Sequence, residues 1–515
     1  MHQPDEWILI LDYGSPYTQL IARKIRKQQI YCEIHPFYSK LEAFAKNPPS
    51  GIILSGSSKN VNDSSAPSFN PEILDADVPV LGINYGMQLI ADYFKPGCVK
   101  TTGKGRFTRS ELIIDVHTEL VKEVPEESIV WINKGDNIKS IPKEFKVIAH
   151  TDKKKIAALK HEQKPIFGIQ FHPETAHTVY GERILKNFAR TICGLKDSWT
   201  SESFIESTVK TIRRKVGDDR VLCALSGGVD STVVATLLHK AIGNQLQCVF
   251  IDNGLLRLNE FEDVLAVYKE KLNLPVKGID ASQQFITRLE GIIDPEEKRK
   301  IIGHTFIDVF DKAIEGENDF KYLAQGTLYP DVIESVTVKD ASVAVKSHHN
   351  VGGLPEKMNL ELIEPVRELF KDEVRSVGSA LGIPDRFIKR HPFPGPGLAV
   401  RVISDITPEK LGILRKADDI FITELRNEGL YDEVWQALAV LLPIQSVGVT
   451  DDKRTYEFTA ALRAVNSKDG MTAEWVHLPH PFLDKVSKRI MNEIHGINRV
   501  VYDISSKPPA TIEWE

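Results

Sequence analysis

A glycine-rich turn at residues 226–231 limits the choice of folds for this chain more than any other segment. The turn, SGGVDS, follows the stretch 220–225 (RVLCAL), which has the nearly continuous apolar character of a strand buried on both faces. After the turn, apolar residues between Val233 and Ile242 recur at helical spacing. A buried strand that leads through a tight turn into a helix is the start of a βαβ unit, so the sequence predicts an α/β fold with a parallel sheet.

The same turn has the chemistry of an anion-binding loop. Adjacent glycines let backbone N–H groups approach an anion closely, and the following helix adds positive potential at its N-terminus. The chain has no GxxxxGK(S/T) motif, so this is not a Walker loop. The SGGxDS pattern instead resembles the loop of ATP pyrophosphatases, which hold the pyrophosphate leaving group while AMP is transferred to a substrate oxygen. Asp252 ends the next apolar segment, and ligands lie at strand ends in such sheets. The predicted ligands of ATP and pyrophosphate are Ser226, Gly227, Gly228, Asp230, Ser231 and Asp252.

Composition excludes several classes of protein. The chain has 515 residues, enough for several domains, and 65 basic against 71 acidic residues give a net charge of −6. A slightly acidic chain does not favour a nucleic-acid partner, and no apolar run approaches the ~20 residues that span a bilayer. The N-terminus is acidic, unlike a signal peptide, and the five scattered cysteines include no CxxC pair. We therefore expect a cytoplasmic protein with reduced thiols, no structural zinc, and neither nucleic acid nor membrane as a partner.

Changes of composition along the chain predict three domains. A second strand–turn–helix start lies at residues 7–25, so two parallel-sheet domains are expected. The polar stretch 198–203 has the character of a linker, and the Pro- and Gly-rich stretch 391–397 excludes helix and central strand. The predicted domains are 1–196, 197–390 and 391–515. Within the last domain we expect strands at 398–402, 444–449, 455–465 and 499–503, mainly helix over 408–440, and a helix at 482–495.

The first predicted domain contains a nucleophile elbow without a nucleophile. Residues 80–88 (VLGINYGMQ) have the strand and the G-x-n-x-G turn of such an elbow, with Asn84 at its tip. Far downstream, His172 and Glu174 suit a base that is oriented by a carboxylate. Together these segments resemble the class I glutamine amidotransferases, whose triad is Cys–His–Glu. A carboxamide is not a useful nucleophile, so we expect Asn84, His172 and Glu174 to be a degenerate triad.

Two further departures from the amidotransferase pattern favour a natural loss of glutaminase activity, because deliberate inactivation would normally replace only one residue. Ser57 stands where that family has the second glycine of Ser-Gly-Gly-Pro, which helps to form the oxyanion hole. Asn133 and Lys134 stand where it has Ser-His ahead of Gly-Asp. The nearest cysteines in sequence, Cys32 and Cys98, lie outside any elbow and are not expected to act as nucleophiles.

From about residue 7 to residue 515 the chain resembles the glutamine-hydrolysing GMP synthetase family. Long strings carry the resemblance, namely 225–231, 252–257 (DNGLLR), 324–327 (AQGT), 329–331 (YPD), 346–355 (KSHHNVGGLP), 390–401 (RHPFPGPGLAVR) and 498–515 (NRVVYDISSKPPATIEWE). The resemblance implies a Rossmann-like class I amidotransferase domain, an ATP pyrophosphatase domain, and a small C-terminal α/β domain that dimerises and completes the XMP site. It also implies the reaction, in which XMP O2 attacks the α-phosphorus of ATP and ammonia then displaces AMP to give GMP.

The resemblance also assigns roles to single residues. Asp331 and Glu334 match carboxylates implicated in catalysis, and Lys346 matches a cation on a lid loop over the polyphosphate. Mg²⁺ bound with ATP would neutralise the leaving pyrophosphate, with Asp230 and Asp331 as the expected metal ligands. The expected XMP contacts are Gln445, Arg499, Lys507, Thr511, Ile512 and Glu513.

The preferred hypothesis is an ATP-dependent XMP aminase that uses free ammonia and dimerises through its C-terminal domain. A first alternative keeps this chemistry with other substrates. The expected loss of glutaminase activity allows another amine, and the segment 450–452 (TDD), which departs from the family's Gly-Asp context near the nucleotide site, allows a modified purine nucleotide. A second alternative is a non-catalytic nucleotide-binding regulator, which the complete phosphate loop disfavours. A separate ammonia-supplying protein is left open, and the basic run 298–300 is interpreted as a solvated helix face.

Overall fold

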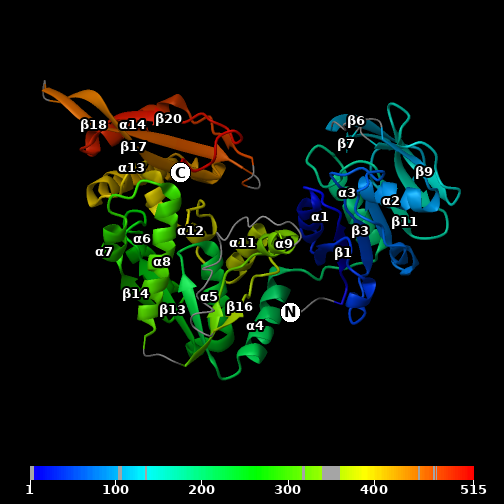
Figure 1. Ribbon diagram of the computed structural model, residues 1–515, viewed down its shortest axis with the longest axis horizontal. Helices are drawn as coiled ribbons and strands as arrows, with labels where there is room; N and C mark the ends of the chain where they lie inside the picture. Colours follow the sequence, from blue (N-terminus) through cyan, green and yellow to red (C-terminus); the bar gives the residue numbers. More distant parts are fainter. Residues whose placement is uncertain are drawn as a thin grey trace. The chain divides into compact units, whose positions relative to one another are not determined.

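The computed structural model describes residues 5–101, 107–133, 136–315, 319–338, 360–450, 453–467, 470 and 472–515 (Figure 1). The chain separates into two compact units, residues 1–207 and 208–515. Of the residues with predicted roles, Lys134, Lys346 and Asp451 lie outside the described part, as does the side chain of Glu334. Among the described helices, none is long and apolar enough to cross a membrane.

The first unit is built on a mixed sheet whose first five strands are parallel. In spatial order its strands are β2 (Cys32–Pro36), β1 (Ile8–Asp12), β3 (Gly51–Leu54), β4 (Val80–Ile83), β11 (Ile166–Ile169), β10 (Ile156–His161), β9 (Phe145–Thr151), β6 (Phe107–Ile114) and β7 (Glu127–Asn133). Every residue of β3, β4 and β11 is buried, as expected for strands covered on both faces. The strands from β10 to β7 pair antiparallel.

Helices connect the parallel strands of this unit. The α-helices that lie wholly within its described part are α1 (Thr18–Arg26), α2 (Tyr85–Phe94) and α3 (Gly181–Lys186), and α4 (Ser201–Val216) crosses into the second unit. Shorter turns of helix are η1 (Leu41–Phe44), η2 (Pro71–Asp75), η3 (Glu119–Val121) and η4 (Asn187–Ile192), and β5 (Val99–Thr101) pairs with β8 (Asp136–Ile138) in a separate ribbon. Residues 85–91 of α2 are all buried, so the turn between β4 and α2 lies inside the protein.

The second unit contains a wholly parallel sheet. In spatial order its strands are β14 (Val276–Asp280), β13 (Leu246–Asp252), β12 (Arg220–Leu225), β15 (Phe320–Ala324) and β16 (Glu361–Ile363). The helices that accompany it are α4 (Ser201–Val216), α5 (Val229–Ile242), α6 (Glu260–Ala266), α7 (Ser282–Arg288), α8 (Pro295–Ala313), α9 (Tyr329–Val338), α11 (Lys371–Ala380) and α12 (Asp385–Ile388), with short turns at η5 (Gly243–Gln245) and η6 (Val267–Lys271). The parallel α/β prediction is confirmed.

The C-terminal part of the second unit combines two helices with a second sheet (Figure 1). The sheet contains β17 (Gln436–Thr450), β18 (Lys453–Asn466), β19 (Glu474–Trp475) and β20 (Ile497–Tyr502). The helices are α13 (Pro408–Asn427) and α14 (His480–Glu493). Two short turns, η7 (Gly397–Arg401) and η8 (Tyr431–Glu433), lie before and after α13. The predicted helix at 482–495 and strand at 499–503 are thus present within two residues at each end.

Two local predictions in this part are wrong. Residues 397–401 form a short 3₁₀ turn where a strand was predicted, because Gly397 has φ +62° and its backbone packs against Leu255. The helix predicted over 408–440 ends at Asn427, and β17 begins at Gln436. Residues 437–442 (ALAVLL) suit either element by local preference, and their pairing with β18 decides for the strand.

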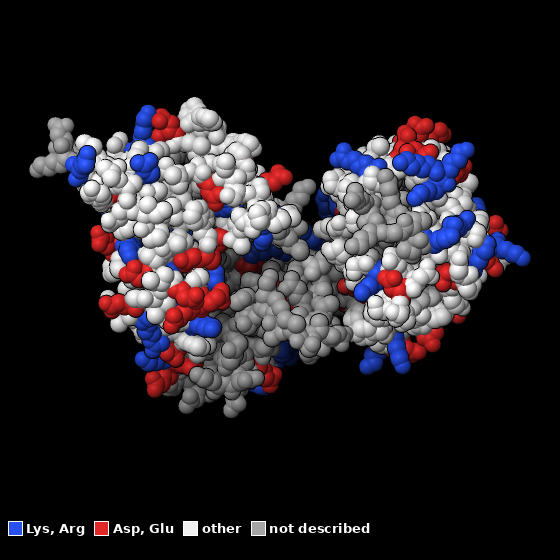
Figure 2. All heavy atoms as spheres, turned by 45° about the horizontal axis from the view of Figure 1, so that its top comes forward, with Lys and Arg blue, Asp and Glu red and all other residues white. Residues whose placement is uncertain are grey.

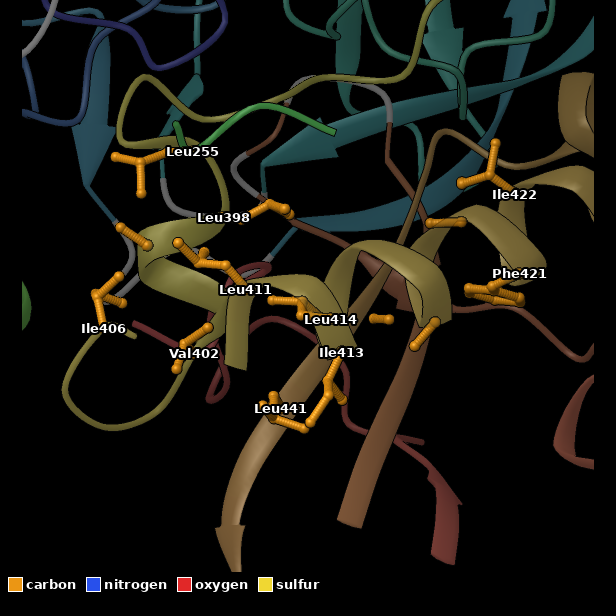
Figure 3. Close-up of a cluster of buried hydrophobic side chains, with 14 of the residues drawn as sticks. Leu255, Leu398, Val402, Ile406, Leu411, Ile413, Leu414, Phe421, Ile422 and Leu441 are labelled. Carbon is orange, nitrogen blue, oxygen red and sulfur yellow. The ribbon is translucent and has the colours of Figure 1, made fainter. Parts of the chain in front are cut away.

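One hydrophobic core runs through the second unit. It includes Leu222 and Val249 from the parallel sheet together with Leu398, Leu411 and Leu441 from the C-terminal part. Figure 3 shows Leu255 and Leu398 close to the α13 side chains that pack on β17. The core is therefore continuous across residue 390, and the division into domains 1–196, 197–390 and 391–515 stays a prediction.

Lys298 contradicts the interpretation of 298–300 as a solvated face. Its side chain is fully buried on α8, and its Nζ donates to the carbonyls of Ala399 (3.1 Å) and Val402 (2.8 Å). The same ammonium pairs with Glu515 Oε2 at 2.7 Å. Local sequence cannot show this burial, because the segments that cover Lys298 come from about 100 and 217 residues further along the chain.

Charge on the surface is mixed. On the face shown in Figure 2, basic and acidic side chains are interspersed over both units, in agreement with the small net charge of −6. Binding to a nucleic-acid backbone relies on gathered basic side chains. The described part of this face shows no patch made of basic side chains alone.

His391 is a buried, neutral histidine that joins the chain to η8. Its Nδ1 accepts from the backbone N–H of Ala437 (3.2 Å), so Nε2 carries the proton and donates to the Tyr431 carbonyl (2.9 Å). The imidazole stacks on the Tyr431 ring with the centroids 3.9 Å apart. Burial lowers the pKa of His391 to about 4, and nearby Arg257 and Arg426 add to this shift against the hydrogen bond to Tyr431.

We predict that His391 makes the second unit acid-sensitive. The pKa of His391 in the unfolded chain is about 6.5, so the unfolded state binds the additional proton between pH 6.5 and about 4. The free energy of unfolding is unaffected above pH 6.5 and falls by about 3 kcal/mol as the pH drops through this window. Urea unfolding at pH 7.5, 6, 5 and 4.5 should show this slope in the wild type and a shallower one in His391→Gln. Equal slopes in the two proteins would contradict the prediction.

Candidate active sites

The predicted phosphate loop, residues 226–231, joins β12 to α5 at the carboxyl edge of the parallel sheet. Gly227 has φ +74°, a conformation that side chains disfavour, and Gly228 precedes the first helical residue, Val229. Ser231 Oγ accepts from the Ser226 N–H (3.2 Å) and lies 3.1 Å from both Ser226 Oγ and the Gly228 carbonyl. The first N–H groups of α5 have no acceptor within the helix, so the loop presents backbone donors for an anion.

Only one of the two carboxylate oxygens of Asp230, in this loop, has a partner. Its Oδ2 forms an ion pair with Lys371 Nζ, while its Oδ1 is buried without a hydrogen-bond partner. Gly326, just after β15, lies beside Asp230, since a Cβ there would be 3.5 Å from the Asp230 Cβ. The structure thus brings the ends of β12 and β15 together, as their parallel pairing requires.

Lys371 was missed by sequence reasoning. It is the first residue of α11, and its side chain is 46% exposed, so its ammonium can reach both Asp230 and solvent. A cation in the first turn of a helix opposes the helix dipole. That mismatch is the signal by which the sequence could have pointed to Lys371.

Asp252 ends β13, the strand beside β12. Its Oδ1 accepts from the Gly254 N–H at 2.8 Å, and Arg415 holds the same turn by donating to the carbonyls of Gly254 (2.5 Å) and Leu256 (2.9 Å). Burial raises the pKa of Asp252, opposed by the Gly254 hydrogen bond and assisted by Asp280 at the paired end of β14.

The predicted catalytic carboxylates lie at the start of α9. Asp331 Oδ2 accepts from the Leu328 N–H at 2.9 Å, which occupies one of its oxygens with the helix entry. Glu334 is on the same helix. Their catalytic roles, and that of Lys346, stay predictions.

The described residues offer a limited set of ligands for Mg²⁺. They contain no group of three or more His, Cys, Asp or Glu side chains placed to hold a metal. Proteins that bind Mg²⁺ with a nucleotide commonly supply only one or two carboxylates and leave the other positions to phosphates and water. The unpartnered Oδ1 of Asp230 fits such a ligand, and Asp331 has one further oxygen to offer.

A surface cavity of about 500 Å³ lies beside the C-terminal tail. It is lined by Val501, Tyr502, Asp503, Ile504, Ser505, Ala510, Thr511, Glu513 and Trp514. Thr511 and Glu513, two of the predicted XMP contacts, both line this cavity, and their contact with a nucleotide stays a prediction. Glu513 accepts two hydrogen bonds from Arg401 (3.0 and 2.9 Å) and one from Gln436 (2.7 Å), so its carboxylate is fixed in place.

The other predicted XMP residues are arranged differently. Ile512 is buried in a hydrophobic cluster with Val465 and Ala473. Lys507 Nζ donates to the Gly470 carbonyl at 2.8 Å. Gln445 on β17 and Arg499 on β20 are exposed, and neither they nor Lys507 belong to the cavity lining. Their contact with a nucleotide stays a prediction.

The turn after β4 in the first unit has the backbone of a nucleophile elbow. Asn84 has φ +50° and ψ −103°, and its Nδ2 donates to the Gln170 carbonyl at 3.2 Å. Gly86 is required on its flank, because a Cβ there would lie 2.5 Å from the Leu54 carbonyl oxygen. The tip of the elbow therefore carries a carboxamide that is 6% exposed.

His172 and Glu174 lie at the neighbouring strand end. β11 pairs in parallel with β4, which places the segment from Gln170 to Glu174 beside the elbow. His172 Nδ1 and Glu174 Oε1 are 2.7 Å apart, and because a carboxylate only accepts, Nδ1 donates. Nε2 is buried without a partner, with the rings of Tyr17 and Phe107 at centroid distances of 5.4 Å.

Gly56 and Ser57 lie in the loop that follows β3. Gly56 faces His172, since a Cβ there would lie 3.4 Å from the imidazole Cε1. The next residue, Ser57, is not among the residues with positive φ. Cys32 and Cys98 are buried outside the elbow, and burial raises the pKa of the Cys98 thiol, which makes it a poorer nucleophile.

Comparison with known sequences agrees with this geometry. The class-I glutamine amidotransferase family matches residues 9–192, the NAD synthase family residues 200–299, and the GMP synthase C-terminal domain residues 423–514. A GMP synthase [glutamine-hydrolyzing] of Cytophaga hutchinsonii is 53% identical over 514 residues, covering 99% of this chain and 100% of its own. Proteins of the same name from Nitratiruptor and from Chlorobaculum tepidum are 52% and 54% identical, each with 99% of both chains covered.

Proposed function

This chain belongs to the family of glutamine-hydrolysing GMP synthases, and from that premise we propose that it aminates XMP to GMP with ATP and free ammonia. The observation that supports the choice of ammonia is a contrast between the two units. The phosphate loop of the second unit is complete, with its glycines, hydroxyls and Asp230 in place. In the first unit, by contrast, a carboxamide occupies the tip of the elbow.

In the first proposed step, XMP O2 forms a bond to the α-phosphorus of ATP and the bond to pyrophosphate breaks. The backbone N–H groups at the start of α5 and the hydroxyls of Ser226 and Ser231 would hold the departing anion. Lys371 adds a cation beside the loop. Bound Mg²⁺, held by Asp230 and Asp331, would supply charge neutralisation for the pyrophosphate.

In the second step, ammonia attacks C2 of the adenylyl-XMP and AMP leaves with the former O2. The oxygen at C2 is a poor leaving group until AMP is attached to it. We assign proton transfer from the incoming ammonia to Asp331 or Glu334 and closure over the nucleotides to the segment of Lys346. Arg499 and Lys507 suit the XMP phosphate, and Glu513, with Gln445, Thr511 and the backbone of Ile512, suits the base and ribose.

The first unit, in this proposal, cannot release ammonia from glutamine. Attack on the glutamine carboxamide requires a thiolate, and Asn84 has neither a nucleophilic atom nor a proton for His172 to remove. The His172–Glu174 pair is intact, so the loss lies at the nucleophile and its oxyanion donors. The family's cysteine at this position would thus be replaced by Asn84.

We predict that the full-length protein converts XMP, MgATP and ammonium into GMP, AMP and pyrophosphate in equal amounts. Chromatography of the nucleotides and an enzymatic pyrophosphate assay measure the three products. Omitting ammonium is the control, and it should abolish GMP. No GMP at high ammonium would rule out the proposed function. Turnover of a purine analogue in place of XMP would support the alternative with altered substrates.

We predict that Asn84→Cys alone does not restore useful glutaminase activity. The thiol would regain His172 as its base, but the tetrahedral intermediate also needs preorganised oxyanion donors, and losing one typically costs ~10²–10³-fold in rate. Ser57 replaces the glycine expected to present such a donor, and its φ is not positive. Glutamate release by the variant, with and without ATP and XMP, is the assay. Glutamate formation as fast as GMP formation would show an intact oxyanion hole.

We also propose a homodimer formed through the C-terminal part. Ile444, Val447 and Val449 on β17 and Tyr456 on β18 are large apolar side chains that are 52–71% exposed, and Val447 pairs directly with Tyr456. An exposed apolar group of this kind on one sheet suits burial against a second copy.

Light scattering at micromolar concentration should therefore give twice the chain mass of 57.8 kDa. Val447→Glu should shift the particle towards the monomer mass, because it places a charge in the apolar group. Val179→Glu, at a residue of the first unit that is 64% exposed, is the matched control and should leave the mass unchanged. A wild-type particle of 57.8 kDa would refute the proposed dimer.

A further inference from the structure

Three arginines of the second unit surround the ring of Phe393. The guanidinium carbons of Arg257, Arg390 and Arg401 lie 5.1, 5.4 and 5.0 Å from the ring centroid. Arg401 is fully buried, and the side chains of Arg257 and Arg390 are only 14% and 15% exposed. Such close approach of like charges requires compensating carboxylates and an aromatic face that tolerates cations.

Three carboxylates balance these charges. Glu260 Oε1 accepts from Arg390 at 2.5 Å, and its Oε2 accepts from the backbone N–H of Arg257 at 3.0 Å. Asp418 lies between Arg257 (3.2 Å) and Arg401 (3.7 Å). The third carboxylate, Glu513, belongs to the C-terminal tail and binds Arg401 through both oxygens.

Two of the arginines reach beyond the cluster to the two candidate nucleotide sites. Arg390 Nη1 donates to the carbonyl of Gly227 in the phosphate loop at 2.9 Å, while Nη2 is fixed by Glu260. Arg401 holds Glu513, which also lines the cavity beside the tail. Both contacts use the two-pronged geometry of a guanidinium, which a lysine cannot reproduce.

We propose that Arg390 and Arg401 are positioning residues, Arg390 for the phosphate loop and Arg401 for Glu513; this inference rests on the proposed function. Glycine is free to take either sign of φ, so the peptide after Gly227 can turn its carbonyl oxygen towards a bound phosphate unless something holds that oxygen. Arg390 holds it, and the N–H groups then face the anion. Arg401 likewise fixes the Glu513 carboxylate beside the cavity.

The test compares the MgATP and XMP affinities of two conservative variants, each of which should weaken the binding of only one nucleotide. Full-length Arg390→Lys should bind MgATP about 10-fold more weakly, the effect of losing a hydrogen bond to a charged group, with XMP affinity within twofold of wild type. Arg401→Lys should show the reverse, with XMP about 10-fold weaker and MgATP within twofold. Arg386→Lys, at an exposed arginine of α12, is the matched control and should change neither affinity.

Equilibrium dialysis of each nucleotide alone gives the readout without turnover. Thermal unfolding of each variant shows whether it is folded. If Arg401→Lys does not fold, Gln436→Met replaces it, because it removes the other donor to Glu513 and should weaken XMP selectively.

The outcomes separate this inference from the proposed function. Equal weakening of both nucleotides by both variants, or unchanged affinities in folded variants, would overturn the positioning roles. Wild-type protein that binds both nucleotides but forms no GMP would contradict the proposed function alone. Wild-type protein that binds neither would contradict both.

Discussion

Parallel pairing of strands is the constraint on which both candidate sites depend. Parallel neighbours cannot be joined by a hairpin, so crossovers connect them and the strand ends gather at one edge of the sheet. In the second unit this edge collects Asp230, Asp252 and Gly326 from three adjacent strands. In the first unit the same rule places Asn84 beside the segment of His172. Positive φ at Gly227 and Asn84 then turns each chain sharply into its helix.

Asn84 meets the backbone requirement of the elbow with a carboxamide side chain. Asparagine tolerates positive φ better than most side chains, so it meets the backbone requirement of the elbow without supplying a nucleophile. Its buried Nδ2 donates to the Gln170 carbonyl. The turn leads directly into α2, and the His172–Glu174 pair lies at the neighbouring strand end.

The sequence predicted features that depend on neighbouring residues and missed those that depend on distant ones. The strand before Ser226, the glycine turn and the elbow at Asn84 are local patterns, and all three have the expected backbone. The ion pair of Lys371 with Asp230 joins residues 141 positions apart, and the burial of Lys298 depends on the last residue of the chain. The helix predicted over 408–440 was wrong at its C-terminal end for a related reason, since pairing with β18 decides the structure of residues 437–442.

The isotope composition of the GMP that is formed shows which nitrogen donor the protein uses. Full-length protein would be given XMP, MgATP, unlabelled glutamine and an equal concentration of ¹⁵N-ammonium, and the GMP formed would be analysed by mass spectrometry. We predict GMP that carries ¹⁵N at the exocyclic amine throughout, because Asn84 cannot attack glutamine and ammonia enters from solvent. GMP that contains mainly unlabelled nitrogen would show that the first unit still hydrolyses glutamine, and the proposed loss of its nucleophile would be wrong.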